Sequence, residues 1–323
     1  MKRRTILLGA IGAPALLAAG PTAHAQAYPS KPIRLVSPSP PGGGGDISNR
    51  IIARPLGDLL GQPVVIETRP GGNGVVAAME ALRAGNDGYA IFIGGTTTLV
   101  ANPYLMKSHP FDPATEFAPV SLIGTLPFIL VVSPSLPIRD VRELIAYAKA
   151  QPGKLSFASA NATSLVAAST FNRMTGVDML HIPYKGAPAS LSDVASGQVS
   201  ISFVDIPSAR GLVQSGKLRL LAVTSATRTA LLPQAPTIAE AGLAGYEIIG
   251  WTAMCVPAGT DPAIIQRLSQ ETRKVIARQD VREQLATVGF DAVSSTPDEM
   301  GAFMRAERPR WAKLIRDAGI VPE

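Results

Sequence analysis

Cysteine, histidine and aromatic residues are scarce in this chain of 323 residues, which has one cysteine, three histidines and 5% aromatic residues. A single cysteine cannot form a disulfide within the chain. Because Cys255 lies in the apolar run 252–256, we interpret it as a small buried hydrophobic residue. The scarcity of histidine and cysteine argues against a zinc site, and the scarcity of aromatic residues argues against a stacking platform for sugars or bases. We therefore predict no metal site and no cofactor.

Runs of basic residues are also absent after the N-terminus. The formal net charge is +6, and no cluster of lysine or arginine follows Arg4, so nucleic acid is not an expected partner. The G-x-S-x-G elbow of serine hydrolases is missing. The pattern Gly72-x-Gly74-x-x-Ala77 imitates a dinucleotide fingerprint, but the next strand ends in two glycines instead of the acidic residue that binds a ribose. The sequence thus offers no recognisable catalytic set.

The N-terminus has the pattern of an export signal. Lys2, Arg3 and Arg4 precede an apolar run at 6–19, and Ala23-His24-Ala25 fits a small-x-small cleavage site. The apolar run is too short for a permanent transmembrane helix. We therefore expect residues 1–25 to be a signal peptide, cleaved after about Ala25, and the remaining chain to be periplasmic. Either the twin-arginine route or the general secretory route fits the two arginines.

Residues 33–60 carry the strongest local pattern. A short apolar strand leads into a loop of serines, prolines and four consecutive glycines, and a helical pattern follows Asp46. Glycines without Cβ atoms let a ligand approach backbone N–H groups, and a helix N-terminus adds the positive end of its dipole. This loop is therefore predicted to bind an anion. Its candidate ligand-binding residues are Pro41, Gly42, Gly43, Gly44 and Asp46.

Two residues of this helix leave alternatives open. The carboxylate of Asp46 either caps the helix or points into the cleft. In the cleft it would disfavour a second anionic group on the ligand and favour an ammonium or hydroxyl group. Pro55 removes one helical hydrogen bond, so the helix is predicted to bend or to end early.

Strand-like and helix-like stretches alternate along most of the chain, which predicts an α/β fold with parallel strands. Two long apolar runs, 121–133 and 246–256, contain glycines and are predicted to cross between two lobes. Residues 26–125 plus 253–323 would form lobe 1, and residues 126–252 would form lobe 2.

Ligands of open α/β sheets bind beyond the carboxyl ends of the strands. Small, polar or glycine-rich loops follow the predicted strands of both lobes, and these are the expected contact loops. They are 37–46, 69–74 and 94–98 in lobe 1, and 159–164 and 205–208 in lobe 2.

A series of short motifs extends in order over the mature chain. The motifs are Pro40-Pro41-Gly42-Gly43 with Asp46, Arg69-Pro70-Gly71 with Gly74, Asp87-Gly88-Tyr89, Pro152-Gly153-Lys154-Leu155, His181-x-Pro183-Tyr184-x-Gly186, Leu221-Ala222-Val223-Thr224, Pro236-Thr237-x-x-Glu240-Ala241-Gly242 and Pro257-Ala258-Gly259-Thr260. In these motifs the chain resembles the Bug family, the extracytoplasmic substrate-binding receptors of tripartite tricarboxylate transporters.

The resemblance implies a two-lobed clamshell of the type II periplasmic binding protein kind, which closes over a small carboxylated metabolite. The implied partners are this ligand and membrane transporter subunits or a sensor, and we expect a monomer. The resemblance assigns ligand contacts to the first glycine loop and to several residues outside it. The candidates outside that loop are Gly74, Thr96, Thr97, Ser159, Asn161, Thr163, Ser164 and Asp205.

One segment departs from the family pattern. Leu165 and Ser169 stand where histidine and glutamate are expected, so the second-lobe side of the pocket is predicted to differ. Two other classes of function stay open at the level of sequence. One is an exported hydrolase or isomerase acting on a small acid, and the other is an exported scaffold that binds no ligand.

Overall fold

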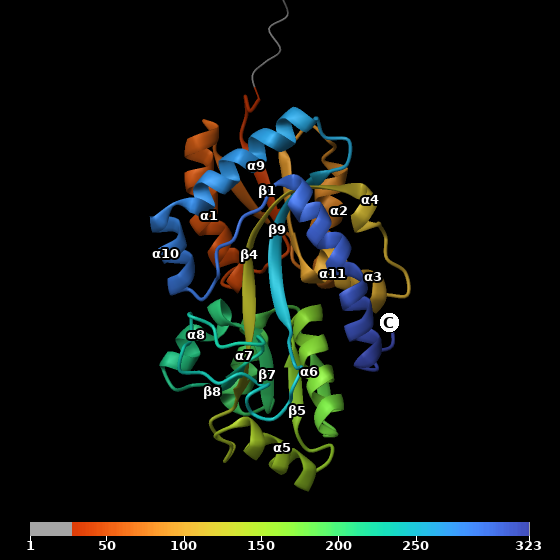
Figure 1. Cartoon of the computed structure of the whole chain (residues 1–323), viewed down its shortest axis with the longest axis vertical. Helices are drawn as coiled ribbons and strands as arrows, with labels where there is room; N and C mark the ends of the chain where they lie inside the picture. The colour runs from red at the N-terminus through yellow and green to blue at the C-terminus, as the bar shows by residue number, and fades with distance from the viewer. Residues whose placement is uncertain (1–27, 323) are drawn as a thin grey trace, which may run out of the picture.

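Two α/β lobes lie end to end and are joined by two long strands (Figure 1). The computed structural model describes residues 28–322. The predicted signal peptide and its cleavage site lie outside the described residues. We use lobe 1 for the elements from β1 to α4 together with α9 and α10, and lobe 2 for the elements from α5 to β8.

The elements follow one another as an alternation of strands and helices in each lobe. The strands are β1 Ile33–Ser37, β2 Val64–Thr68, β3 Ala90–Gly95, β4 Phe117–Val132, β5 Ser156–Ser159, β6 Leu180–Pro183, β7 Ile201–Asp205, β8 Arg219–Val223 and β9 Ile249–Pro257. The helices are α1 Gly44–Leu60, η1 Gly72–Gly74, α2 Val75–Arg83, η2 Thr96–Ala101, α3 Asn102–Leu105, α4 Pro113–Glu116, α5 Val141–Ala150, α6 Ala162–Thr175, α7 Ala187–Ser196, α8 Ile206–Gln214, α9 Pro262–Ala277, α10 Gln279–Thr287 and α11 Pro297–Asp317.

The strands form a continuous sheet in the order β2-β1-β3-β9-β4-β7-β5-β6, and β8 also pairs with β4. In lobe 1, β1 is parallel to β2 and β3, and in lobe 2, β5 is parallel to β6 and β7. The long strands β4 and β9 are antiparallel and pair from Phe117↔Pro257 to Pro127↔Ile249. Beyond this ladder β4 continues into lobe 2 and pairs with β7 and β8. The two predicted crossing runs therefore correspond to β4 and β9.

Helix α1 forms as its apolar spacing dictates. Ile52, Leu56 and Leu60 are buried in one cluster with the strands of lobe 1, and the helix ends where Gly61 adopts the left-handed conformation with φ 73°. The prediction that Pro55 would end the helix early is wrong, because the helix continues through it to Leu60. Burial of the apolar face outweighs one lost hydrogen bond.

Three predicted loops are partly helical. Helix α1 begins at Gly44, with Gly43 as its N-cap, so Asp46 lies inside the first turn and is not the cap residue. Thr96 opens the π-helical turn η2. Helix α6 begins at Ala162, with Asn161 as its N-cap. Polar and small residues are common both in loops and at helix starts. For this reason the residues at these helix starts were predicted as loop.

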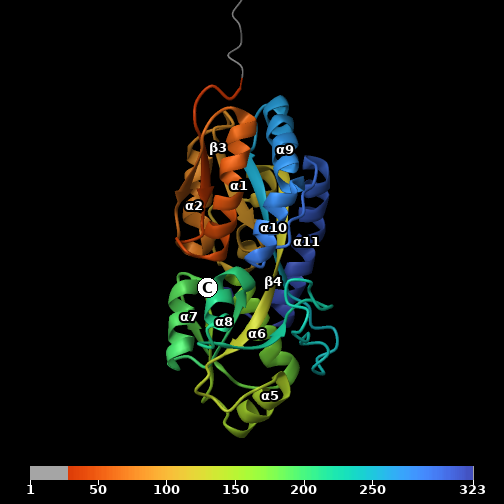
Figure 2. The same ribbon diagram turned by 90° about the vertical axis from the view of Figure 1, so that its left-hand side faces the viewer.

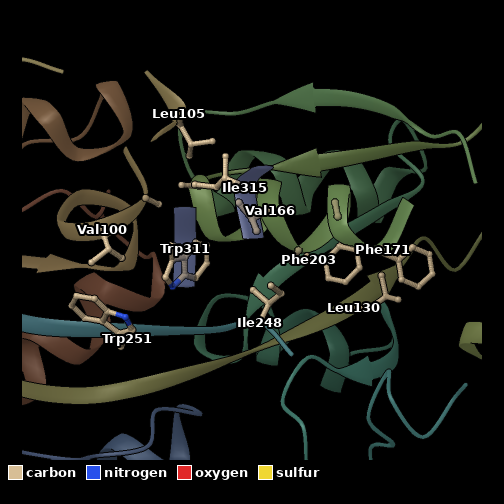
Figure 3. Close-up of a cluster of buried hydrophobic side chains, with 14 of the residues drawn as sticks. Val100, Leu105, Leu130, Val166, Phe171, Phe203, Ile248, Trp251, Trp311 and Ile315 are labelled. Carbon is tan, nitrogen blue, oxygen red and sulfur yellow. The ribbon is translucent and has the colours of Figure 1, made fainter. Parts of the chain in front are cut away.

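The long C-terminal helix α11 packs across the back of both lobes. It contacts η2 of lobe 1, α6 of lobe 2 and the crossing strand β4, and Figure 2 shows it beside the crossing strands. Its Trp311 and Ile315 belong to one buried cluster with Val100 of lobe 1 and Phe203 of lobe 2 (Figure 3). The largest hydrophobic cluster thus lies on the side of the junction that α11 covers, and the cleft lies on the opposite side.

Candidate ligand-binding site

A cavity of about 390 Å3 is lined by both lobes and by the crossing strands. Its volume is at the lower end of the range typical of ligand pockets. Lobe 1 contributes residues 38–40, 43–45, 71–74 and 93–98 and Met106; lobe 2 contributes Ala160, Asn161, Thr163, Tyr184, Lys185, Gly186, Ala187, Asp205 and Ser208; and the crossing strands contribute Leu126, Phe128, Gly250, Trp251 and Thr252.

Five helices from the two lobes begin at this cavity. In lobe 1 they are α1 and α2, and in lobe 2 they are α6, α7 and α8. Their N-cap residues all line the cavity and are Gly43, Gly74, Asn161, Gly186 and Asp205. Each helix start presents N–H groups that have no partner within the helix, together with the positive end of the helix dipole. The cavity therefore favours negative charge with few charged side chains.

The two lobes touch at the edge of the cavity. The N–H of Gly44 donates to Oγ of Ser208 across the interface at 2.9 Å. A Cβ on Gly44 would collide with Oδ1 of Asp205, and a Cβ on Gly186 would lie 2.7 Å from Cγ of Pro40. Both glycines are thus required by close approach of the opposite lobe, and the structure is a closed arrangement.

The threonines that follow β3 have different roles. Thr96 Oγ1 accepts a hydrogen bond from the N–H of Trp251 at 2.9 Å, and Thr98 Oγ1 accepts one from the N–H of Gly95 at 3.1 Å. The hydroxyl of Thr97 has no hydrogen-bond partner among residues 28–322 and is half-buried at the cavity. Thr97 is therefore the threonine of this turn whose side chain is free for a ligand.

In lobe 2 the start of α6 is a reciprocal cap. Oδ1 of Asn161 accepts from the N–H of Ser164 at 2.9 Å, and Oγ of Ser164 accepts from the N–H of Asn161 at 3.0 Å. Between them, Thr163 is 3% exposed and lines the cavity, and within the described part of the chain its hydroxyl has no partner. The hydroxyl of Thr163 is therefore free to bond a ligand atom in the cavity.

Asp205 caps α8 at the same interface. Its Oδ1 accepts from the N–H of Ser208 at 2.9 Å, and the residue is 9% exposed. Burial raises the pKa of this carboxyl above its ordinary value, although the hydrogen bonds from Ser208 act in the opposite direction. The side chain is therefore already engaged in capping α8, and it lies close to Gly44 of lobe 1.

The structure brings most of the predicted site residues together. Those that line the cavity are Gly43, Gly44, Gly74, Thr96, Thr97, Asn161, Thr163 and Asp205. Pro41, Gly42, Asp46, Ser159 and Ser164 do not line it. Ser164 belongs to the cap of α6, and Oγ of Ser159 lies 2.6 Å from Nε2 of His181.

Asp46 faces away from the cleft. Its Oδ2 accepts from the N–H of Gly42 at 3.0 Å, and its carboxylate forms an ion pair with Arg50 at 3.0 Å. The alternative in which Asp46 points at the ligand is therefore wrong, as is its role as the N-cap. An arginine four residues after an aspartate is a helical ion pair, and this spacing was the sequence signal for the true orientation of Asp46.

The loop after β6 was missed by sequence reasoning. Tyr184, Lys185 and Gly186 line the cavity, and they follow a strand of the parallel sheet directly. The rule that ligands lie beyond strand carboxyl ends, applied to this strand as to the others, would have found them. Ser39, in the predicted contact loop 37–46, also lines the cavity, as do Phe128 and Trp251, which no local signal distinguished.

The indole of Trp251 is held in place by the buried carboxylate of Glu307. Its Nε1 donates to Oε2 of Glu307 at 3.2 Å, and Nε1 of Trp311 donates to the same oxygen at 3.0 Å. Glu307 also pairs with Arg310 at 3.2 Å. Figure 3 shows the two indoles next to each other at the junction of the lobes. Helix α11 thus positions one wall of the cavity.

The two residues that departed from the family pattern do not line the cavity. Leu165 packs against the large hydrophobic cluster, and neither Leu165 nor Ser169 lines the cavity. The second-lobe wall is therefore formed by the helix starts and the loop after β6.

Two further properties concern the whole of residues 28–322. None of the helices in this range combines the length and the hydropathy that a membrane span requires. Within the same range, no three residues among His, Cys, Asp and Glu gather in a way that could bind a metal ion.

Comparison with protein families and solved structures gives consistent matches. Residues 48–320 match the family described as the tripartite tricarboxylate transporter family receptor, TctC. The chain is 34% identical over 322 residues to protein BugT of Bordetella pertussis, covering 99% of this chain and 98% of that protein.

Two solved structures of relatives contain carboxylates. Rpa4515 of R. palustris, solved with adipate, superposes with a TM-score of 0.89 at 34% identity and covers 92% of this chain and 100% of that one. MatC of Rhodopseudomonas palustris, solved with bound malate, gives a TM-score of 0.84 at 27% identity and covers 89% of this chain and 100% of that one.

Proposed function

Since the chain belongs to the tripartite tricarboxylate transporter receptor family, we propose that it captures a small carboxylate between its lobes and presents it to a membrane partner. The observation that carries this proposal is the convergence of five helix N-termini from both lobes on one cavity. Such termini bind anions without a cationic side chain. Relatives solved with adipate and with malate support a carboxylate as the ligand.

The family consists of transporter receptors and not of enzymes. The alternative of an exported hydrolase or isomerase is therefore discarded. The predicted resemblance and the predicted α/β periplasmic binding protein fold are both confirmed.

Capture requires that the ligand favours one conformation. Each lobe supplies only part of the helix starts, so an anion gains all of its contacts only when the lobes are closed. Its differential affinity for the closed state then moves the equilibrium toward that state. We assign the lobe boundaries to the crossing strands, near residues 125/126 and 252/253, and the bending to residues 124–127 and 248–252. Hinges of this kind absorb domain closure in a few residues.

The cellular context of the proposal follows from the export signal and the family. The protein would act in the periplasm as a monomer after cleavage near Ala25. The closed complex would be recognised by transporter subunits or by a sensor in the membrane.

Thermal unfolding of the mature protein with a panel of small carboxylates tests the function. A ligand at about 100 times its dissociation constant adds about 2.7 kcal/mol to the free energy of unfolding. For a chain of this size this corresponds to a rise in Tm of about 5–10 °C. Alcohols and amides of the same carbon skeletons serve as controls and should produce no shift.

A molecule retained from the expression host would hide such a shift. The protein is therefore unfolded, freed of small molecules and refolded, and the extract is examined by mass spectrometry. If the refolded, empty protein shows no shift with any carboxylate, the proposed function is wrong and a scaffold that binds no ligand becomes the better explanation.

A further inference from the structure

The two edges of the sheet are protected to different extents. The continuous sheet ends at β2 in lobe 1 and at β6 in lobe 2. The N–H groups of Leu180 and Tyr184 donate to carbonyls on the β5 side, so the alternate residues of β6, His181 and Pro183, face outward. Pro183 has no N–H group to donate. A proline at such a position protects a sheet edge against the addition of another strand.

The edge of β2 lacks this protection. Backbone hydrogen bonds to β1 are made at Pro63 and at Arg69. Since bonding alternates along a parallel pair, Val64, Ile66 and Thr68 turn their N–H and C=O groups away from β1. None of these outward groups has a hydrogen-bond partner among residues 28–322. We call this edge, Val64–Thr68, the open edge.

Apolar side chains lie along the open edge. A groove of about 880 Å3 lies between α1 and β2, and its apolar lining residues are Ala53, Pro63, Val64, Val65 and Ile66. Val65 is 53% exposed, and no lysine stands within the strand. Unpaired backbone groups beside exposed apolar side chains are the features by which a sheet accepts an extended segment as an additional strand.

The charges of the groove are mainly positive. Its charged lining residues are Arg50, Arg54 and Asp58. Arg50 forms an ion pair with Asp46, whereas the exposed guanidinium of Arg54 has no hydrogen bond or ion pair within the described chain. Opposite charges on neighbouring strands stabilise a sheet and like charges destabilise it. The groove is therefore complementary to an acidic segment. A second copy of this chain, paired through the same edge, would bring a second set of arginines to it.

We propose that the open edge is a docking site for an extended, acidic segment of a partner protein. The segment pairs with the outward backbone groups of Val64, Ile66 and Thr68 and places carboxylates beside Arg54. The open edge belongs to lobe 1 alone and is separate from the cleft, so this inference does not depend on the proposed function. Because β2 leads into residues 71–74, which line the cavity, a docked partner lies on the strand that carries one of the cavity loops.

The test uses two synthetic peptides of eight residues with blocked ends. In one peptide valine alternates with glutamate, and in the other valine alternates with lysine. Each is titrated into the 15N-labelled mature protein and followed by NMR. We expect the valine–glutamate peptide to bind about 5-fold or more tightly than the valine–lysine peptide. When it is bound, the N–H groups of Ile66 and Thr68 should exchange with solvent about 10-fold more slowly, since pairing protects them.

Two variants examine the backbone and the charge separately. Ile66→Pro removes an outward N–H group that β1 does not use, and it should abolish peptide binding. Arg54→Glu should weaken the valine–glutamate peptide about 3- to 10-fold and strengthen the valine–lysine peptide. Arg83→Glu is the matched control, because Arg83 is an exposed arginine of α2 outside the groove. It should change neither affinity. If Ile66→Pro does not fold, Arg54→Glu still decides the question.

Three results would overturn the proposal. The first is that neither peptide binds, or that both bind the wild type equally. The second is that Arg54→Glu and Arg83→Glu bind the two peptides alike. The third is slow exchange of the N–H groups of Ile66 and Thr68 in the protein alone, together with a dimer in sedimentation equilibrium, because a second copy then occupies the open edge. The receptor function stands in all three cases.

Discussion

At the scale of single residues, Glu307 joins the C-terminal helix to the wall of the cavity. It is 8% exposed, and its carboxylate accepts from the indoles of Trp251 and Trp311 and pairs with Arg310. A buried carboxylate is tolerated because these donors replace its water. Arg310 also lies 3.7 Å from Glu247, close to the start of β9. One acidic residue thus organises contacts from α11 and from the junction of the lobes.

Glu307→Gln is expected to destabilise the protein. The amide keeps one acceptor oxygen but turns an NH2 group toward donors, and Arg310 loses its nearest anion. We expect the free energy of unfolding to fall by about 1–3 kcal/mol, measured by denaturant unfolding. Glu283→Gln, which changes an exposed glutamate of α10 in the same way, should have almost no effect. Equal stability of the two variants would contradict the role of Glu307.

The residues of the site were only partly predictable from the sequence. The four consecutive glycines identified the loop before α1, because glycine is the residue that permits close approach, and three of these glycines, Gly43, Gly44 and Gly45, line the cavity. The partners of Asp46 and Asp205 lie within four residues of them in the chain. The hydroxyl of Thr96, in contrast, accepts from the N–H of Trp251, 155 residues away, and a local pattern carries no information about so distant a partner. Lys185 lies beside recognised motif residues in the sequence. Its position at the cavity and its lack of a partner in the described chain are known only from the structure.

At the scale of elements, the cap residue of α8 makes the stability of the protein depend on pH. Burial raises the pKa of Asp205 above the value of about 3.9 for an unfolded chain. Between these two pKa values the folded state binds more protons than the unfolded state. The contribution of this carboxyl to the free energy of unfolding is therefore greatest at low pH. It is lost as the pH rises through the pKa of the folded state.

Asp205→Asn should remove this dependence. Asparagine caps helices as well as aspartate does, and it cannot ionise. The Tm of the variant relative to wild type should therefore rise as pH increases from 4 to 7. Asp205→Ala, which removes the cap, should cost about 0.5–2 kcal/mol instead. A constant difference between wild type and Asp205→Asn across this range would show that the carboxyl is not perturbed by its burial.

The sequence predicted the elements better than their ends. Apolar spacing identified the strands of both lobes and the two crossing runs, since burial on a sheet enforces the pattern. The starts of α1 and α6 were misplaced by a few residues, and the turn η2 was predicted only as a loop, because glycine, threonine and alanine at a helix start resemble a loop. At α1 the N–H of Gly44 also donates to Ser208 of the other lobe, a contact that only the tertiary structure supplies.

At the scale of the whole molecule, closure depends on how closely the lobes approach. Gly44 lies against Asp205, and Gly186 lies against Pro40. These contacts flank the cavity and bring the two lobes into direct contact with each other. One additional methyl group at such a contact should hold the lobes apart, although each lobe keeps its own core.

Gly44→Ala is expected to bind ligand at least 10-fold more weakly without unfolding. Alanine is favourable in a helix, so the Tm of the free protein should not fall. With saturating ligand, the radius of gyration from small-angle X-ray scattering should decrease in the wild type and stay constant in the variant. Gly211→Ala is the control, because a Cβ there meets no atom within 4 Å. Wild-type affinity in Gly44→Ala would contradict closure through this contact.

The shared carboxylate of Glu307 has an optical consequence. The chain contains two tryptophans, and both donate to that one oxygen. All indole fluorescence therefore arises from a single neighbourhood, and one of the two emitters forms part of the cavity wall. We expect a ligand in the cavity to change the polarity around Trp251, whereas Trp311 lies on α11 and should respond to the position of that helix. The protein thus carries an intrinsic, label-free reporter of its own occupancy, readable in a simple emission spectrum.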